Sequence, residues 1–133
     1  KGDITGTGAV PWTRTYDTPY VPSPLLYGEH LCYLRHLQGI LTCLKAKAGT
    51  TLFGPKKLPG IRRVYASPVG AQGRIYVVGQ EGTTVVLNQG SKFEILARNR
   101  LNDVFSASPS MVENTLFLRG EENLYCISEH PSQ

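Results

Sequence analysis

Apolar residues fall in short runs along this sequence, and each run is bounded by glycine, proline or polar residues. The β-branched runs 75–78 and 83–87 are separated by a turn with a glycine at each end. Two such runs joined by a glycine-containing turn predict an antiparallel hairpin. A turn at Gln72-Gly73 precedes the hairpin, and a Ser67-Pro68 pair leads into the whole unit.

The same order of signals recurs on both sides of this unit. Ser-Pro pairs at 23, 67 and 108 begin three copies, at intervals of 44 and 41 residues. Repeats of roughly 40–50 residues are typical of propeller blades, each a four-stranded antiparallel sheet. The sequence therefore predicts an all-β fold of about three β-propeller blades, either as a partial propeller or as half of a six-bladed ring formed by two chains.

The repeat also assigns the blade boundaries within one domain. Proline cannot donate to a strand ladder, so the run Ala9–Thr15, with Pro11 inside it, is predicted to be an outer, edge strand. The predicted outer strands of the next two blades are Thr51–Phe53 and Lys92–Ala97. The parts are the outer strand of a preceding blade (1–16), a first blade (17–60), a second blade (61–102) and a third blade without its outer strand (103–133).

These boundaries leave the predicted strand Leu124–Ile127 without a neighbour on one side. An unpaired strand edge is a template for pairing with another chain. We therefore expect a partner. It is either a second copy, whose segment Ala9–Thr15 completes the third blade in a homodimer, or the remaining blades of a longer parent chain. A separate protein partner is also compatible with the scaffold.

Three cysteines are too few for a disulfide framework. If a hairpin turn spans His36–Gly39, Cys32 lies opposite Cys43, and a cross-strand disulfide is geometrically conceivable. We interpret the pair instead as two buried thiols that pack as small apolar side chains, with the disulfide as the alternative. Cys126 holds the place of Cys43 in the third repeat, which predicts a packing role for it too.

Charge and hydropathy argue against two classes of partner. No apolar run is long enough to span a bilayer. The net charge is +4, and basic residues cluster between 45 and 63. They are not interleaved with stacking aromatic residues, so we interpret them as a solvated loop rim and expect no nucleic-acid partner.

Candidate chemistry is sparse. Two histidines and two cysteines lie close in the sequence: His30, Cys32, His36 and Cys43. They are not expected to bind a metal, because His36 falls in a turn and nothing fixes a fourth ligand. The serines at 23, 67 and 108 recur once per repeat, as turn residues do and a nucleophile does not. We therefore predict no catalytic residue, no metal site and no cofactor.

The stretch 41–53 resembles the blade motif of the pyrroloquinoline-quinone-like (PQQ-like) repeat proteins. That motif has an aspartate where Lys45 stands here, a Thr-Gly turn, and a tryptophan that docks between blades, where Phe53 stands. Trp12 fills the docking position of the preceding blade, whereas the second blade lacks a docking tryptophan. The family includes quinoprotein dehydrogenases and an outer-membrane assembly lipoprotein, so the resemblance implies a propeller scaffold in a periplasmic or secreted protein.

The resemblance does not assign an activity, because such scaffolds occur in enzymes and in binding modules. A quinoprotein dehydrogenase needs a divalent cation held by oxygen ligands, a catalytic aspartate and, in that group, adjacent cysteines. Our leading hypothesis is a non-enzymatic repeat module that binds a protein or ligand, or is a structural part of a larger propeller. The alternative is a fragment of a PQQ-dependent oxidoreductase whose cofactor residues lie in missing blades.

Loops at one end of a propeller converge on its axis, where binding sites of such folds form. Aromatic and arginine residues are enriched at binding hot spots. The candidate surface at this end consists of Tyr20, Arg35, Arg62, Arg63, Tyr65 and Phe105. For Tyr65 and Phe105 we favour packing between neighbouring blades over a role in this surface.

Overall fold

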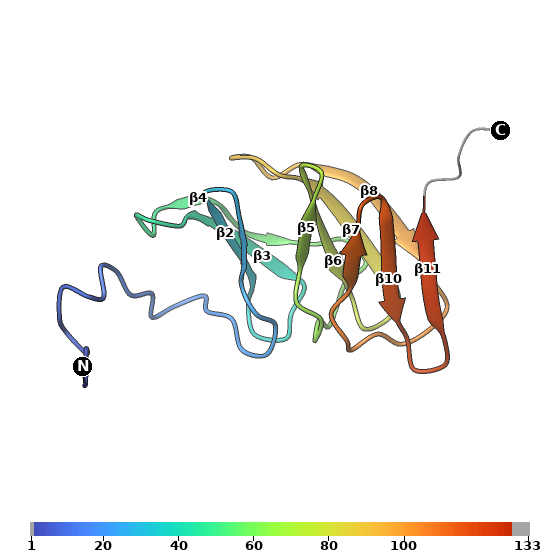
Figure 1. Cartoon of the computed structure of the whole chain (residues 1–133), viewed down its shortest axis with the longest axis horizontal. Coiled ribbons are helices and arrows are strands. Elements are labelled where there is room, and N and C mark those ends of the chain that lie inside the picture. The colour runs from blue at the N-terminus through green and yellow to red at the C-terminus, as the bar shows by residue number, and fades with distance from the viewer. Residues whose placement is uncertain (1, 129–133) are drawn as a thin grey trace.

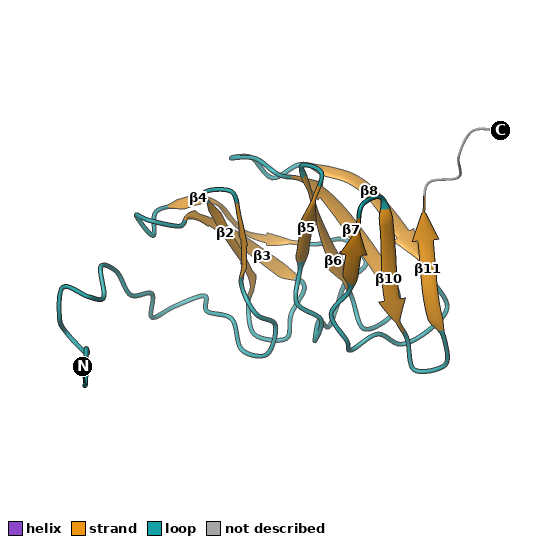
Figure 2. Ribbon diagram, viewed as in Figure 1, coloured by secondary structure: helices purple, strands orange, loops and turns teal. Residues whose placement is uncertain are grey.

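The computed structural model describes residues 2–128, which form eleven β-strands. The strands make three antiparallel sheets that lie in a row along the molecule (Figure 1), which confirms the all-β prediction. The described range contains no helix that could cross a membrane (Figure 2). The sheets are β1 (Leu25–Tyr27), β2 (His30–Leu34), β3 (Ile40–Lys45) and β4 (Thr51–Lys57); β5 (Val69–Ala71), β6 (Arg74–Val78), β7 (Thr83–Asn88) and β8 (Ile95–Arg100); and β9 (Ser110–Val112), β10 (Thr115–Arg119) and β11 (Leu124–Ser128).

Each sheet is a meander in which every strand pairs with the next strand along the chain. The connecting turns use residues with positive φ, such as Gln72 (51°) and Gly73 (71°) between β5 and β6. Two positive φ values in succession are what a two-residue type I′ hairpin turn requires. The turn that the sequence predicts at Gln72-Gly73 is therefore present, and glycine occurs there because it adopts positive φ without strain.

Facing sheets bury two apolar cores between them. The core between the first and second sheets includes Leu34, Leu41, Val77 and Val85, all with no exposed surface. The core between the second and third sheets consists of Ala66, Val78, Phe105, Leu116 and Leu118. Because the middle sheet is buried on both faces, its strands β6 and β7 are apolar at successive positions instead of alternating.

Backbone hydrogen bonds tie neighbouring sheets together at the end where β2–β3 and β6–β7 turn. The N–H of Val64 donates to the carbonyl of Leu37 at 2.9 Å, and the N–H of Phe105 donates to the carbonyl of Gln80 at 3.0 Å. Val64 and Phe105 hold the same place in the repeat, and both are buried. Tyr20 holds this place before the first sheet, yet it is 74% exposed.

The outer strands differ from the prediction. β4 continues beyond Phe53 because its pairing with β3 resumes after a register shift. β8 starts at Ile95, later than predicted, because the N–H of Asn88 bonds to the carbonyl of Glu94 and closes a wider turn. The segment Ala9–Thr15 forms no strand within the described part of the chain, and its role as the outer strand of a preceding blade stays a prediction. This segment pairs with none of the described strands, and a strand forms only beside another strand whose N–H and C=O groups meet its own.

Cys32 and Cys43 form a disulfide, so the interpretation as two buried thiols is wrong. The two residues are direct partners in the β2–β3 ladder, with Cα atoms 4.1 Å apart. Direct cross-strand partners have their side chains on the same face and close together, which allows the bond. The packing role predicted for Cys126 is also wrong: it is exposed, and its cross-strand partner is Phe117.

Candidate binding site between the second and third sheets

A cavity of about 340 Å³ lies between the second and third sheets. Its size falls within the roughly 300–1,000 Å³ typical of ligand pockets. Most of its wall is apolar: Tyr76, Val86 and Leu101 come from the second sheet and its exit, and Met111, Leu116, Leu118 and Ile127 come from the third.

Aromatic rings pack at the corresponding interface between the first and second sheets. An added Cβ on Gly70 would come within 2.6 Å of the Tyr27 ring, so this ring lies directly on the backbone of β5. The Tyr27 hydroxyl accepts a hydrogen bond from the N–H of Gly73 at 2.7 Å. Phe53 and Phe93 pack edge to face, with ring centroids 5.8 Å apart. These rings close the outer part of the first interface.

Alanines replace two of those rings in the next repeat. Ala71 holds the place of Tyr27, and Ala97 holds the place of Phe53. Ala97 pairs directly with Val86, which lines the cavity. Directly paired residues share a face of the sheet, so the Ala97 side chain also faces the third sheet. Two rings are therefore lost from this interface, and the third sheet has three strands where the first two sheets have four. Both differences leave space between the second and third sheets.

Polar groups lie at both ends of this cavity. At one end the side-chain amide of Gln72 donates to the carbonyl of Glu113 at 3.2 Å and also bonds the side chain of Asn114. Asn99 and Arg100 lie at the other end of the cavity. β6 and β8 run in the same direction, and Gln72 lies before the start of β6 whereas Arg100 is the last residue of β8. An elongated apolar floor with polar ends suits an extended polypeptide segment better than a compact ligand.

β11 forms one rim of the cavity through Ile127 and Ser128. Among the described strands, β11 pairs only with β10. Its other edge therefore presents N–H and C=O groups that an incoming strand can use. Strand addition of this kind takes affinity from main-chain hydrogen bonds and specificity from pockets that accept alternate side chains.

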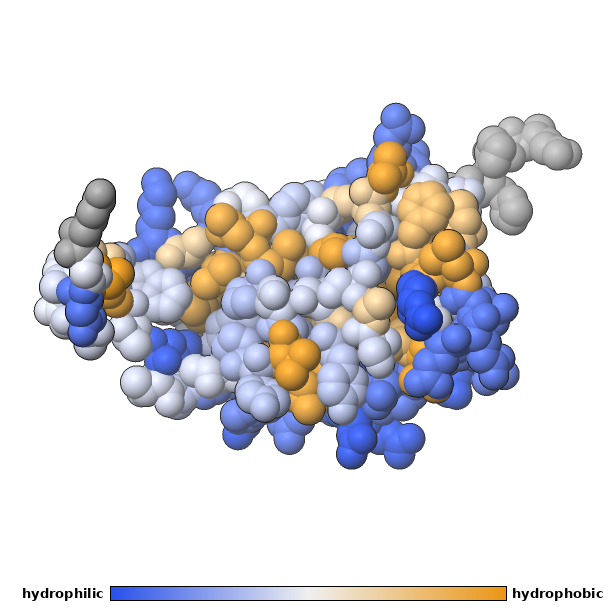
Figure 3. Space-filling model, turned by 60° about the horizontal axis from the view of Figure 1, so that its bottom comes forward, coloured by the Kyte–Doolittle hydropathy of each residue, from blue (hydrophilic) through white to orange (hydrophobic). Residues whose placement is uncertain are grey.

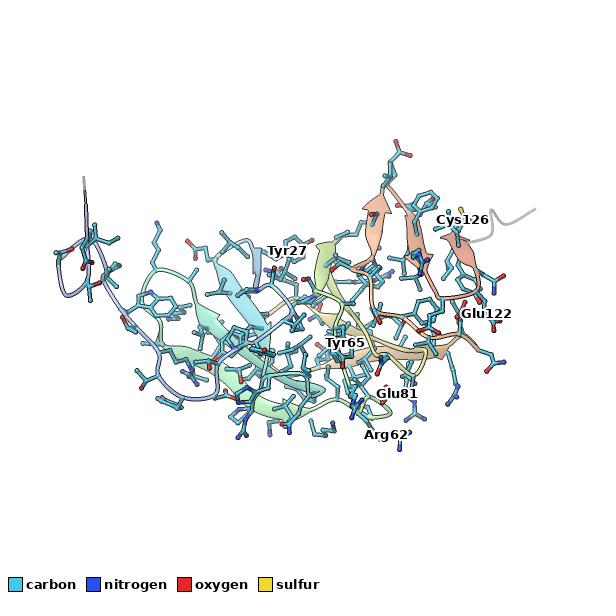
Figure 4. The ribbon with its side chains drawn as sticks, turned by 90° about the horizontal axis from the view of Figure 1, so that it is seen from below. Tyr27, Arg62, Tyr65, Glu81, Glu122 and Cys126 are labelled. Carbon is cyan, nitrogen blue, oxygen red and sulfur yellow. A yellow bond between two sulfur atoms is a disulfide. The ribbon has the colours of Figure 1, made fainter. Side chains whose placement is uncertain are left out.

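Three of the predicted surface residues come together around Glu81. The Nε of Arg62 is 3.6 Å from Glu81 Oε1, and the N–H of Arg63 donates to the same oxygen at 3.1 Å. Arg62, Glu81 and Tyr65 lie near one another in Figure 4. The Arg62 side chain is 87% exposed, so water screens this ion pair and it adds little to stability.

The other three predicted residues do not join this group. Arg35 lies by the first sheet, with its Nε 4.0 Å from Asp17 Oδ1, and Tyr20 is exposed. Phe105 does not belong to a surface. It is 1% exposed and packs against Tyr125, with ring centroids 5.8 Å apart, because it lies between the second and third sheets.

Trp12 lies on the turn between β3 and β4. Its indole N–H donates to the carbonyl of Ala46 at 3.0 Å, and an added Cβ on Gly49 would come within 2.7 Å of its ring. Trp12 holds the place of Phe53 in the repeat, and Phe53 packs against Phe93 in the turn before β8. Both aromatic residues therefore reach from an outer-strand position to the turn of the following sheet.

The carboxylate of Asp103, which the sequence analysis did not single out, organises the turn between β10 and β11. Asp103 accepts hydrogen bonds from the N–H groups of Val104 (2.7 Å), Glu122 (3.3 Å) and Asn123 (3.1 Å), and from the Tyr125 hydroxyl (3.1 Å). Burial raises the pKa of this carboxyl group. The hydrogen bonds outweigh burial and hold the pKa below its usual value. For Tyr125, burial raises the pKa of the hydroxyl.

Within residues 2–128, no group of three or more His, Cys, Asp and Glu side chains could hold a metal ion. The cavity between the second and third sheets offers apolar contact, amide and guanidinium donors and an adjoining strand edge. These are the elements of a binding site.

No family model matches this sequence, and no curated protein does. Among solved structures, the chain is similar to the computationally designed Ika4 protein, with a TM-score of 0.59, 10% identity and coverage of 79% of this chain and 63% of that one. It is also similar to BamB from Moraxella catarrhalis, with a TM-score of 0.44, 16% identity and coverage of 85% and 46%. The chain thus spans less than two thirds of either structure.

The likeness to the designed protein shows the fold alone: the three sheets are blades of a β-propeller-type structure. The resemblance to PQQ-like repeats is supported at this level and no further, because no family model matches.

Proposed function

We propose that this chain is a non-enzymatic β-propeller module that binds a polypeptide partner, and that the binding site is the cavity between the second and third blades together with the edge of β11. The observation that carries this proposal is the exchange of Tyr27 and Phe53 for Ala71 and Ala97 in the next repeat, which opens a cavity beside an available strand edge. A strand that pairs along β11 directs alternate side chains to the cavity, and the residue opposite Ile127 enters it.

The module also serves as a structural part of a larger propeller. The outward face of the third blade exposes Val112 (62%) and Leu124 (74%), and the first blade exposes Leu26 (63%) on its edge strand. Figure 3 shows hydrophobic surface at the right-hand end of the molecule, where β9–β11 lie. Val112 and Leu124 lie on the two edge strands of this sheet, aligned with opposite ends of β10, so exposed apolar groups extend across the blade, as is typical of an interaction surface.

We further propose that the protein works in an oxidising compartment, either the periplasm or the extracellular space. The Cys32–Cys43 disulfide supports this location, because disulfides persist in such compartments and are rare where thiols are kept reduced.

The test is titration with a blocked synthetic peptide of about seven residues, in which phenylalanine and valine alternate with threonine and the ends carry lysine. Saturating peptide is expected to slow amide hydrogen exchange in β11. A matched peptide with N-methyl groups on the residues that face β11 is expected not to bind, because it cannot donate to the strand edge. Equal binding of both peptides would contradict strand addition.

Two variants locate the site. Ile127→Arg places a charge at the rim of the cavity and is expected to weaken peptide binding at least tenfold, since burying an unpaired charge is costly. Leu124→Arg is the matched control, because Leu124 is 74% exposed and alternation in β11 directs it away from Ile127. Circular dichroism of both variants checks that the fold is retained.

A further inference from the structure

We infer that the polypeptide partner is a second copy of this chain, joined head to tail so that the third blade of each copy packs on the first blade of the other. This inference rests on the proposed binding at β11 and names the partner that the site takes. The internal repeat supports it. The contacts between neighbouring described blades show which contacts the first blade and the third blade can each still make with a second copy.

The first observation concerns Tyr20. Its counterparts Val64 and Phe105 are buried against the preceding blade, with exposures of 0% and 1%, whereas Tyr20 is 74% exposed. The N–H groups of Val64 and Phe105 donate to Leu37 and Gln80, and the corresponding acceptor in the third blade is the carbonyl of Glu121. Packing of the third blade of a second copy on Tyr20 would supply both the buried surface and this acceptor.

The second observation concerns the serines that begin the repeats. Ser23 donates its N–H to Ser67 Oγ, and Ser67 donates its N–H to Ser108 Oγ, both at 2.8 Å. Continued by one step, this series pairs the N–H of Ser108 with the Oγ of Ser23 in a second copy. Ser108 of the third blade therefore carries the N–H donor that matches the Ser23 Oγ acceptor on the first blade of a second copy.

The third observation concerns the segment before the first blade. Residues 11–16 make no backbone-to-backbone hydrogen bond within the described part of the chain. Trp12 nevertheless holds this segment at an outer-strand position by packing on Gly49. From there the segment can pair with β11 of a second copy. Alternation then keeps Trp12 on its own first blade and turns Pro11 toward the second copy's cavity.

Charge favours the same arrangement. The turn between β10 and β11 carries the exposed residues Glu121 and Glu122. The turn between β2 and β3 carries the exposed residues Arg35 and His36. Head-to-tail packing brings these two turns to the same end of the assembly. Two copies then close a ring of six blades, within the roughly 4–8 blades that propellers use, through two equivalent interfaces.

Size exclusion with light scattering tests the assembly. A mass of twice 14.6 kDa is expected at micromolar concentration. Val112→Arg, on the outward face of the third blade, is expected to give a folded monomer. Leu96→Arg is the control, because Leu96 is also exposed (48%) but lies on the outer strand of the middle blade, and it is expected to leave the dimer intact.

A second variant tests the atomic register. Ser23→Ala keeps the N–H that bonds Ser67 but removes the Oγ that would accept from Ser108 of the second copy. It is expected to weaken the dimer about 25-fold, because each of the two equivalent interfaces loses one hydrogen bond and one such bond is worth about fivefold. Crosslinked dimers should contain pairs between segment 9–16 and β11, and slow exchange of the β11 amides should disappear on dilution.

The outcomes separate this inference from the proposed function. A well-folded monomer that binds the synthetic peptide along β11 overturns the second copy as partner and leaves the binding function standing. A dimer that survives Val112→Arg overturns the head-to-tail interface. Failure of both dimerisation and peptide binding overturns the inference and the proposed function together.

Discussion

Ser67 Oγ accepts a hydrogen bond from the backbone N–H of Ser23 at 2.8 Å, although 44 residues separate them. The same bond recurs one blade later, from the N–H of Ser67 to Ser108 Oγ at 2.8 Å. Residues that resemble ordinary turn formers in the sequence therefore link each blade to the next. Hydrogen bonds are directional, so this repeated bond helps to fix how neighbouring blades are oriented.

The serine link predicts a specific loss of stability. Ser67→Ala and Ser108→Ala are each expected to lower the free energy of unfolding by about 1 kcal/mol, because each removes the acceptor of an interblade hydrogen bond. Urea unfolding at low protein concentration measures the effect. Ser106→Ala, an exposed serine in the same lead-in segment, is the control, and an equal loss in that variant would show that the link contributes nothing.

The Cys32–Cys43 disulfide is expected to stabilise the folded chain by roughly 2–3 kcal/mol, because it closes a short loop and restricts the unfolded chain. Unfolding with and without reductant should show this difference in the unmodified protein. Cys126→Ala should retain the full difference, because Cys126 is exposed and lies outside the bridge. A reductant effect that persists in Cys32→Ala would place its origin elsewhere.

Gly49→Ala is expected to displace Trp12. An added Cβ would lie 2.7 Å from the indole ring, so the ring must move toward water, and its fluorescence should shift to longer wavelength. Trp12 is the only tryptophan in the sequence, so the emission reports this contact alone. Gly73→Ala is the matched control: Gly73 has nearly the same positive φ (71° against 68°) but nothing within 4 Å of an added Cβ. Equal emission from both variants would contradict the docking of Trp12.

Ala97→Phe restores the residue type that the first blade has at this place. The new ring faces the third blade and is expected to raise the free energy of unfolding by about 1 kcal/mol through partial burial. It should also reduce peptide binding, because it fills the cavity that the peptide side chain enters. Leu96→Phe, on the opposite face of the same strand, should do neither. Tighter peptide binding by Ala97→Phe would contradict the proposed site.

Period and turn chemistry were enough to predict the all-β repeat fold and the position of Cys32 opposite Cys43, because both depend on residues close in sequence. They did not decide between two thiols and the disulfide that forms. The outer strand predicted at 9–15 stays a prediction, because a strand needs a neighbour and no described strand lies beside it. The sequence presents Phe105 both as a surface candidate and as a residue that packs between blades, and its burial against the preceding blade agrees with the second interpretation. Loop position alone does not decide between the two. The cavity was not predicted either. It depends on Ala71 and Ala97 in place of Tyr27 and Phe53, and only the structure shows that those two rings fill the first interface.

Asp103 predicts the acid sensitivity of the third blade. Its pKa is lowered from 3.8 in the folded chain by hydrogen bonds that outweigh burial, so the ionised carboxylate stabilises the fold at pH values above 3.8. That stabilisation is lost as the pH falls through the lower, folded pKa. Asp103→Asn is therefore expected to lower the melting temperature by several degrees at neutral pH, and the difference from the unmodified protein should shrink below pH 3.8.

Glu122→Gln removes a charge from the same turn but keeps the N–H that donates to Asp103, and it should change the melting temperature less. Thermal unfolding followed by circular dichroism between acidic and neutral pH measures all three proteins. A difference for Asp103→Asn that does not shrink in acid would show that the carboxylate acts through shape and not through its charge.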